Sequence, residues 1–172
     1  GKPLSIKLVN NYYKPGPATN ADVKRRITRI DNAEKMGFSC LWYVDGNYVE
    51  GYPDISANNW AGGVDFEDGT SAEKNRSKVS FEFAPVTTQT AREAYELVLK
   101  YAGCYLNRDS QEKRIIEQVI TGNYTTTKTG LIDKVEQAGG WPILKTGKIL
   151  LDTDKDGMPD EWEKKNGLNA AD

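Results

Sequence analysis

Five carboxylates near the C-terminus follow a spacing that suits a calcium ion. Residues 152–163 read D-x-D-x-D-G-x5-E, with a further aspartate at the ninth position. Ca²⁺ takes roughly six to eight oxygen ligands at about 2.3–2.6 Å, so a short loop must turn sharply at a glycine and supply oxygens from alternate residues. The predicted ligands are one backbone carbonyl, that of the methionine, and the side chains of the acids: Asp152, Asp154, Asp156, Met158, Asp160 and Glu163.

An acidic surface turn before a helix is the alternative interpretation of this loop. Five carboxylates in so short a loop would repel each other without a cation, and the complete pattern therefore favours the ion. The chain contains no second match to the pattern, so we expect a structural site. Residues 148–151 are expected to be extended, and residues 161–166 are expected to form a short helix that ends at Gly167.

The composition excludes several classes of function. None of the 172 residues is histidine, which removes Ser-His-Asp and Cys-His catalysis and zinc sites that use imidazole. A net charge of −2 without a basic stripe gives no reason to expect a nucleic-acid partner. No apolar run reaches the roughly 18 residues that a membrane span needs. Cys40 and Cys104 fit either one disulfide or two buried thiols.

The first half of the chain reads as strands and loops. Asp45 and Gly46 form a hairpin-type turn dipeptide between two of the strand patterns. Residues 53–77 are rich in Asp, Asn, Gly and Ser, and we expect a long ordered loop there with Trp60 as its anchor. Alternation of apolar and polar residues predicts strands over 4–13, 41–44, 47–50 and 79–83.

The second half carries two amphipathic helical patterns. Thr90 and Glu93 have the spacing of a capping box, which predicts a helix that runs to Leu99 or Ala102. A second helix is predicted from Asp109 or Ser110 to Gly122. The apolar residues of both helices are interpreted as packing surface. Those of the second helix are expected to point inward: Ile115, Ile116, Val119 and Ile120.

Several sequence strings carry a family resemblance. They are VNNYYKPGP over residues 9–17, WYVDGNYVEG over 42–51, AYELVLKYAG over 94–103 and GGWP over 139–142, followed by the acidic loop. Together they resemble the downstream part of bacterial pectate lyases, polysaccharide lyases with a right-handed parallel β-helix. The terminal loop resembles an EF-hand-like or thrombospondin-type calcium loop.

The resemblance implies a mixed α+β fold in three parts. Residues 1–88 would hold the final strands of the β-helix with long loops. Residues 89–147 would form a helical extension that packs on those strands, and residues 148–172 would form the calcium-binding tail.

The resemblance also implies an activity for the parent protein. That activity is Ca²⁺-dependent β-elimination of polygalacturonate by a secreted, cell-surface or periplasmic bacterial enzyme. The family's catalytic carboxylates lie on earlier coils, and this chain is expected to begin at or after the last ones, with truncation at Gly1. We therefore expect no catalytic residue here, assign no arginine that role, and expect a monomer that binds pectic polysaccharide but is inactive alone.

Aromatic and basic residues are the remaining candidates for contact with sugar. Trp60, Tyr43 and Lys14 could stack on a sugar ring or pair with a uronate, although packing in the core explains Trp42 better and Trp60 equally well. The alternative function is a non-catalytic carbohydrate-binding or cell-surface module that calcium stabilises. A structural tail that binds only calcium is a third possibility.

Overall fold

The structure, a computed structural model, describes residues 4–32, 37, 40–124, 127 and 130–172. The chain forms two compact units, Gly1–Gly140 and Trp141–Asp172. The first unit mixes strands with helices and contains the hydrophobic core. The boundaries predicted after residues 88 and 147 remain predictions.

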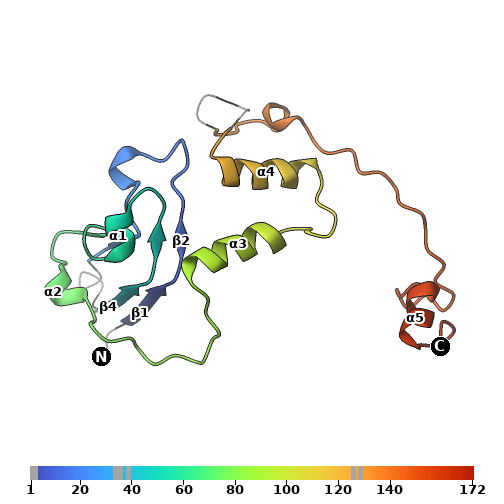
Figure 1. Ribbon diagram of the computed structural model, residues 1–172, viewed down its shortest axis with the longest axis horizontal. Coiled ribbons are helices and arrows are strands. Elements are labelled where there is room, and N and C mark those ends of the chain that lie inside the picture. The colour runs from blue at the N-terminus through green and yellow to red at the C-terminus, as the bar shows by residue number, and fades with distance from the viewer. Residues whose placement is uncertain (1–3, 33–36, 38–39, 125–126, 128–129) are drawn as a thin grey trace. The chain divides into compact units, whose positions relative to one another are not determined.

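Three pairs of parallel strands organise the first unit (Figure 1). Strand β1 (Leu4–Val9) pairs with β4 (Cys40–Asp45), β2 (Tyr12–Tyr13) with β5 (Tyr48–Val49), and β3 (Thr28–Ile30) with β6 (Val64–Phe66). Leu4 stands opposite Cys40, Tyr12 opposite Tyr48 and Thr28 opposite Val64, which is a separation of 36 residues each time. The chain thus follows one path twice, and the second pass lies beside the first.

The corner between the first two strands of each pass is built from a left-handed residue. Asn10 has φ 57° and Gly46, 36 residues later, has φ 66°. The left-handed backbone at Gly46 disfavours any residue with a Cβ, and a Cβ there would also force the Asn10 side chain to shift. The single strand predicted over residues 4–13 is interrupted at the corner at Asn10 and forms β1 and β2. The strands predicted on either side of Gly46 are confirmed, but the predicted hairpin is wrong. Gly46 bends the chain from one sheet into the next, and β5 pairs with β2.

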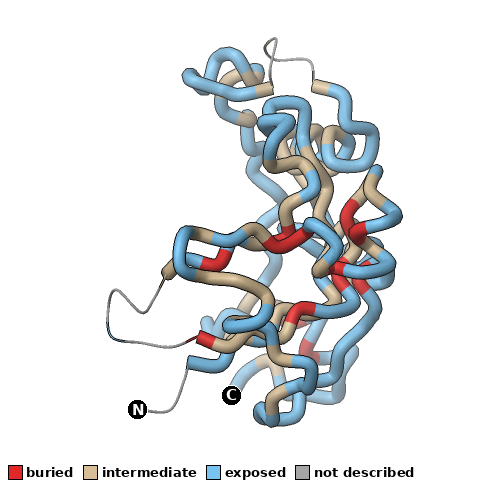
Figure 2. Tube along the Cα trace, turned by 90° about the vertical axis from the view of Figure 1, so that its left-hand side faces the viewer, coloured by how far each residue is buried: buried red, intermediate tan, exposed pale blue. Residues whose placement is uncertain are grey.

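The inward side chains of the two passes form one small apolar core. Its buried members come from the strands, from the residue next to β3 and from the helix over residues 53–57, and Trp42, Tyr52 and Trp60 pack around them. Figure 2 shows the buried positions as short red stretches separated by longer exposed ones. The core residues are Ile27, Ile30, Val44, Val49, Ile55 and Val64.

Two asparagines, Asn47 and Asn59, are buried within this core and form hydrogen bonds with each other. Asn47 is 1% exposed; its Nδ2 donates to the Leu8 carbonyl at 2.8 Å and to Oδ1 of Asn59 at 3.0 Å. Its Oδ1 accepts from the backbone N–H of Asn11 at 2.9 Å. Asn59 in turn donates to the carbonyls of Asn47 and Ile55. This network ties the corner of the first pass to the corner of the second.

The segment predicted as one long loop over residues 53–77 is regular in part. It contains α1 (Pro53–Ala57), strand β6 and α2 (Ala72–Asn75), so the loop prediction is wrong. Pro53 at the first helical position and Ser71 as N-cap start these short helices within a polar composition. Residues 79–83 form no strand, contrary to prediction. Two 3₁₀ turns, η1 (Ala21–Val23) and η3 (Val135–Ala138), complete this unit with the long helices.

The two long helices begin and end as their sequence patterns predict. Helix α3 (Ala91–Tyr101) starts at the Thr90–Glu93 capping box, and α4 (Ser110–Thr121) starts at Asp109 and ends at left-handed Gly122. The inward packing predicted for α4 is wrong for three of its residues. Side chains of Ile115, Val119 and Ile120 are exposed, and Ile116 is half-buried.

Helix α3 docks on the outside of β2 and β5 through tyrosines. The rings of Tyr12 and Tyr95 stack at 4.2 Å, and the Tyr12 hydroxyl donates to Glu50 at 2.6 Å. Nζ of Lys14 lies 3.2 Å from Oε1 of Glu50 and donates to the carbonyl of Ile120 in α4 at 3.2 Å. Burial and the bond to Glu50 both raise the pKa of Tyr12, so this hydroxyl stays protonated.

Glu50→Gln is expected to lower stability at pH 7 and to change little at pH 3. The hydrogen bond from Tyr12 lowers the pKa of Glu50 below 4.5, with Lys14 adding to the effect. A carboxyl group whose pKa is lower in the folded state stabilises the fold above its unfolded pKa, and this contribution is lost as the pH falls through the folded value. At pH 7 the variant should melt a few degrees lower than the natural chain. This shift corresponds to the loss of about 0.5–1 kcal/mol of stability, the value expected for a half-exposed pair.

The measurement is thermal unfolding of the two proteins at both pH values, followed by circular dichroism. Glu96→Gln, on the exposed side of α3, is the matched control. An equal loss at pH 3 and pH 7 would show that the charge of Glu50 is irrelevant.

The second unit contains one regular element, helix α5 (Asp160–Asn166), which ends at left-handed Gly167 as predicted. Residues 148–151 form no regular element. Both cysteines are free, so the disulfide alternative is wrong. The buried-thiol alternative is confirmed for Cys40 and is wrong for Cys104, which is exposed. No helix in the described ranges is both long enough and apolar enough to cross a bilayer.

Candidate functional site

The acidic loop of the tail is shaped by its own side chains. Oδ1 of Asp152 accepts from the backbone N–H of Lys155 at 2.8 Å, and its Oδ2 accepts from Gly157 at 3.1 Å. Gly157 has φ 94° and Lys155 has φ 65°, so the chain reverses within four residues. Oδ1 of Asp156 accepts from the N–H of Met158 at 2.7 Å. This reversal brings alternate side chains to one side of the loop.

Three of the predicted calcium ligands converge. Carboxylate oxygens of Asp152, Asp154 and Asp156 all lie within 4.8 Å of one another. The side chain of Glu163, on the first turns of α5, is 1% exposed, and its Oε2 is buried without a hydrogen-bond partner in the structure. Oδ2 of Asp154 is likewise buried without a hydrogen-bond partner. Two buried and unpaired carboxylate oxygens beside an acidic triad are what a cation site requires.

Electrostatics around Glu163 agree with that geometry. Burial raises the pKa of Glu163, and the neighbouring Asp154 and Asp156 raise it further. The group is thus held where its negative charge is disfavoured unless a positive charge is added. All predicted donors are oxygens, which suits a hard cation such as Ca²⁺ and not zinc or copper.

Asp160, the fourth predicted side-chain ligand in the loop, has a different set of contacts. Its two oxygens accept from the backbone N–H and the hydroxyl of Thr153, both at 2.8 Å. Nζ of Lys164 lies 3.7 Å away. The Thr153 hydroxyl lowers the pKa of Asp160. These two hydrogen bonds between Thr153 and Asp160 hold the start of the loop against the start of α5. The calcium pattern does not reveal this role of Thr153.

The three residues predicted to bind sugar have separate surroundings. Trp60 packs on the core; its indole N–H donates to the Val44 carbonyl at 2.9 Å, and the guanidinium of Arg76 lies 4.9 Å from its ring. Tyr43 is half-buried and donates to Asp45 at 3.2 Å. Lys14 belongs to the docking contacts of α3. The structure does not test their contact with sugar, which stays a prediction.

An arginine-rich face, formed by Arg25, Arg26 and Arg29, was not predicted from the sequence. Arg29 points outward from β3, opposite Asp65 in β6, and Arg26 forms an ion pair with the same Asp65. Arg25 pairs with Asp54 at 2.8 Å. The three arginine side chains remain 47%, 33% and 51% exposed, in the order Arg25, Arg26, Arg29. A guanidinium matches a carboxylate in a two-pronged contact, so exposed pairs of this kind can exchange partners.

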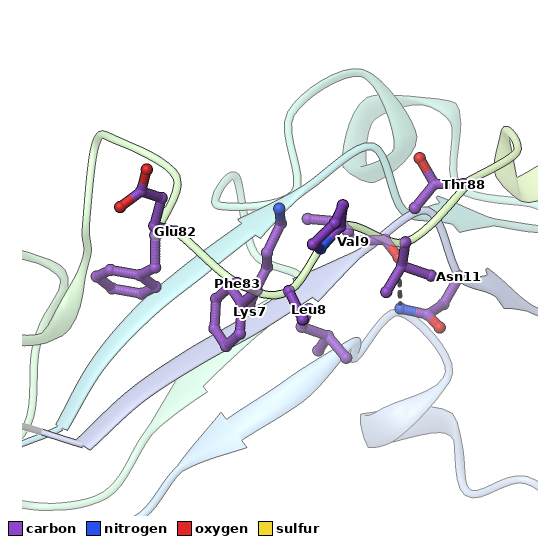
Figure 3. Close-up of a pocket in the computed structure, with 11 residues that line it drawn as sticks. Lys7, Leu8, Val9, Asn11, Glu82, Phe83 and Thr88 are labelled. Carbon is purple, nitrogen blue, oxygen red and sulfur yellow. Dashed lines mark hydrogen bonds between the residues drawn. The ribbon is translucent and has the colours of Figure 1, made fainter.

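A pocket of about 600 Å³ lies between β1 and residues 81–88 (Figure 3). Its lining is largely apolar, and Nζ of Lys7 lies 5.7 Å from the centre of the Phe83 ring. Figure 3 shows these two side chains close to each other at the pocket. The pocket marks where the segment after β6 packs loosely on the first strand.

The chain is similar to fungal proteins over nearly all of its length. It is 32% identical over 162 residues to a probable pectate lyase C of Aspergillus fumigatus and 32% identical over 171 residues to one of Neosartorya fischeri, which covers 94% of this chain and 36% of each relative. A third relative of the same name, from Aspergillus flavus, is 29% identical over 98% of this chain. The chain spans a little over a third of the length of these curated relatives. No family model matches it.

Proposed function

We propose that this chain, which belongs to the pectate lyase family, is part of a protein that as a whole cleaves polygalacturonate by Ca²⁺-dependent β-elimination. The observation that carries the proposal is the similarity of 94% of the chain to proteins named pectate lyase C. The same similarity supports action on pectin outside the cell. The relatives are fungal, whereas the sequence strings resemble bacterial enzymes, and the proposal leaves the source open.

The proposal includes the fold of the first unit, as two successive turns of a right-handed parallel β-helix. Three parallel strand pairs with the same separation of 36 residues support it. So do the corners, where left-handed Asn10 and Gly46 and the bonded pair Asn11 and Asn47 occupy equivalent places in the two passes.

We propose that the arginine-rich face contacts the uronate carboxylates of pectate. β-Elimination needs a base for the C5 proton and stabilisation of the enolate-like charge that develops. An arginine with a pKa above about 12 is a poor base by default, so Arg26 and Arg29 are assigned to binding only. Their present partners are exposed aspartates, which a uronate can replace.

A non-catalytic carbohydrate-binding module is the second candidate for this chain taken alone. Within the described ranges, the only three acids that come close enough to share an ion are those of the tail triad. In the tail, a complete set of ligands would leave the ion no positions for sugar. The catalytic calcium ions of the whole protein therefore belong to residues outside this set, and we propose that the chain binds pectate without cleaving it.

The tail is proposed to hold a structural Ca²⁺. Side chains of Asp152, Asp154 and Asp156 and both oxygens of Glu163 would ligate the ion, with the carbonyl of Met158 and a water held near Asp160 completing the set. The ion would neutralise the buried charge and tie the loop to α5.

Two measurements separate the candidates. Affinity electrophoresis in gels that contain polygalacturonate should retard the chain, and mixing it with polygalacturonate and CaCl₂ should give no rise in ultraviolet absorbance from unsaturated uronides. A rise would show that the chain is catalytic on its own. Equal mobility with and without the polymer would contradict pectate binding.

Arg26→Gln combined with Arg29→Gln is expected to weaken the affinity for polygalacturonate by about thirtyfold, seen as reduced retardation. Two charge-assisted contacts of about 1 kcal/mol each would be lost, and 1.4 kcal/mol corresponds to a factor of ten. Arg114→Gln, which removes one positive charge from α4, is the control for loss of charge outside this face. Fully methyl-esterified pectin lacks the carboxylates and should bind both proteins equally weakly. If the double variant and the control migrate alike in polygalacturonate, the arginine-rich face is not the contact.

A further inference from the structure

The tail unit, Trp141–Asp172, has no apolar interior. It comprises 32 residues, all of them described, and only two of these are buried. Both are carboxylates, Asp160 at 5% and Glu163 at 1% exposed. Its large apolar side chains are exposed: Trp141, Ile143, Leu144, Ile149, Leu150, Leu151, Trp162 and Leu168. Units below about 40 residues usually need a metal, disulfides or a partner to fold, and this one contains no cysteine.

What the unit encloses instead is unpaired negative charge. Oε2 of Glu163 and Oδ2 of Asp154 are buried without a hydrogen-bond partner. Around them stand the carboxylates of Asp152 and Asp156. Burying a carboxylate without a counter-charge costs more free energy than any other common change of environment for a side chain, and folding alone does not recover it here.

The remaining contacts of the unit are local. The backbone N–H of Thr153 donates to Asp160, and the N–H of Leu168 donates to the carbonyl of Glu163 at 2.9 Å. The backbone N–H of Asp160 donates to Leu151 at 2.9 Å, which joins the two ends of the loop. A seven-residue helix is too short to be stable by itself in water, and these hydrogen bonds are too few to stabilise it.

We infer that a calcium ion takes the place of the hydrophobic core in this unit. At neutral pH and without the ion, residues 152–168 are unfolded, and they fold around the ion as a unit separate from the strands and helices of residues 4–121. Metal binding and folding are then one event, because the site does not exist in the unfolded chain. The concentration of free Ca²⁺ sets whether this end of the chain is ordered. The inference rests on the calcium site proposed above and not on any action on pectate.

Amide hydrogen exchange of the whole chain, read by mass spectrometry, tests the inference. In CaCl₂ the amides of Asp160, Glu163 and Leu168 should be protected, and in EDTA they should exchange at the rate of an unfolded chain. The protection of β1, β4 and α3 should be equal in the two solutions. MgCl₂ at the same concentration should restore little protection, because Mg²⁺ demands a tighter octahedral set of ligands.

Asp154→Asn should raise the CaCl₂ concentration needed for protection by at least about tenfold, since even outer partners of a metal ligand are worth roughly 10–100-fold. Asp172→Asn is the matched control: it makes the same charge change at the exposed end of the same unit.

The outcomes distinguish the inference from the proposals beneath it. Protection that persists in EDTA, while calorimetry shows CaCl₂ binding, would overturn the folding inference and leave the site. Protection that persists in EDTA without any heat of CaCl₂ binding would contradict both the folding inference and the proposed calcium site. Loss of protection in β1 and β4 together with the tail would overturn the claim of a separate unit, and equal protection in MgCl₂ would overturn the choice of calcium. None of these results depends on polygalacturonate.

Discussion

Replacing Glu163 by glutamine is expected to stabilise the metal-free tail at neutral pH and to abolish its response to calcium. These effects have opposite signs because the carboxylate of Glu163 is buried beside four aspartates. Glutamine removes the negative charge of Glu163. Without an ion this buried charge destabilises the folded tail, whereas with Ca²⁺ it is needed to ligate the ion. The loss of a bidentate ligand should weaken calcium binding by more than about 100-fold, since even outer partners are worth roughly 10–100-fold.

The pH dependence of the metal-free protein follows from the same residue. Burial and the neighbouring aspartates raise the pKa of Glu163 above its ordinary value of 4.5. A carboxyl group with a raised folded pKa stabilises the fold below its unfolded pKa, and this contribution is lost as the pH rises through the folded value. Order in the metal-free tail should therefore decline from about pH 4.5 upward in the natural chain, and much less in Glu163→Gln.

Protease resistance of the tail, measured in EDTA and in CaCl₂ from pH 4 to pH 8, checks both effects. Glu161→Gln makes the same change at an exposed position of α5 and should behave like the natural chain. If Glu163→Gln leaves the tail no more resistant than the natural chain in EDTA at pH 7, the carboxylate of Glu163 does not destabilise the metal-free tail and the interpretation of its burial fails.

The elements of this protein were predictable where the signal was local. The capping box at Thr90, the glycine stops at Gly122 and Gly167 and the sharp turn at Gly157 depend on a few neighbouring residues, and the structure shows each of them. The acidic loop belongs to this class. Its spacing alone brings Asp152, Asp154 and Asp156 together.

Strand pairing was not predictable in the same way, because the partner lies 36 residues away. Asp45-Gly46 carries the local signature of a hairpin, yet Val49 finds its partner in Tyr13. The arginine-rich face was missed for the same reason: Arg29 and Asp65 meet only through the register of β3 and β6. The inward side of α4 was predicted from periodicity alone, which gives the apolar side of a helix but not whether another element covers it.

Asn47→Ala is expected to cost the first unit about 3–4 kcal/mol, the largest effect of any single substitution that spares the apolar core. The side chain of Asn47 contacts both passes of the chain. Its removal leaves the Asn11 N–H and the Leu8 carbonyl without their partner and deprives Asn59 of a donor to its Oδ1. Each buried group left unpaired costs about 1–3 kcal/mol, and Oδ1 of Asn59 keeps only the backbone N–H of residue 47 as a donor.

Asn47→Asp makes a sharper version of this test. It keeps the size and the Oδ1 acceptor for Asn11 but replaces the donor with a second acceptor, which would face the carbonyl of Leu8 and Oδ1 of Asn59. We expect it to be at least as destabilising as alanine at pH 7 and less so in acid, where protonation restores one donor. Urea unfolding of both variants, with exposed Asn123→Ala as the control, measures the loss. A loss below about 1 kcal/mol for Asn47→Ala would mean that the two passes are held by apolar contacts alone, and that the buried amides are incidental to their alignment.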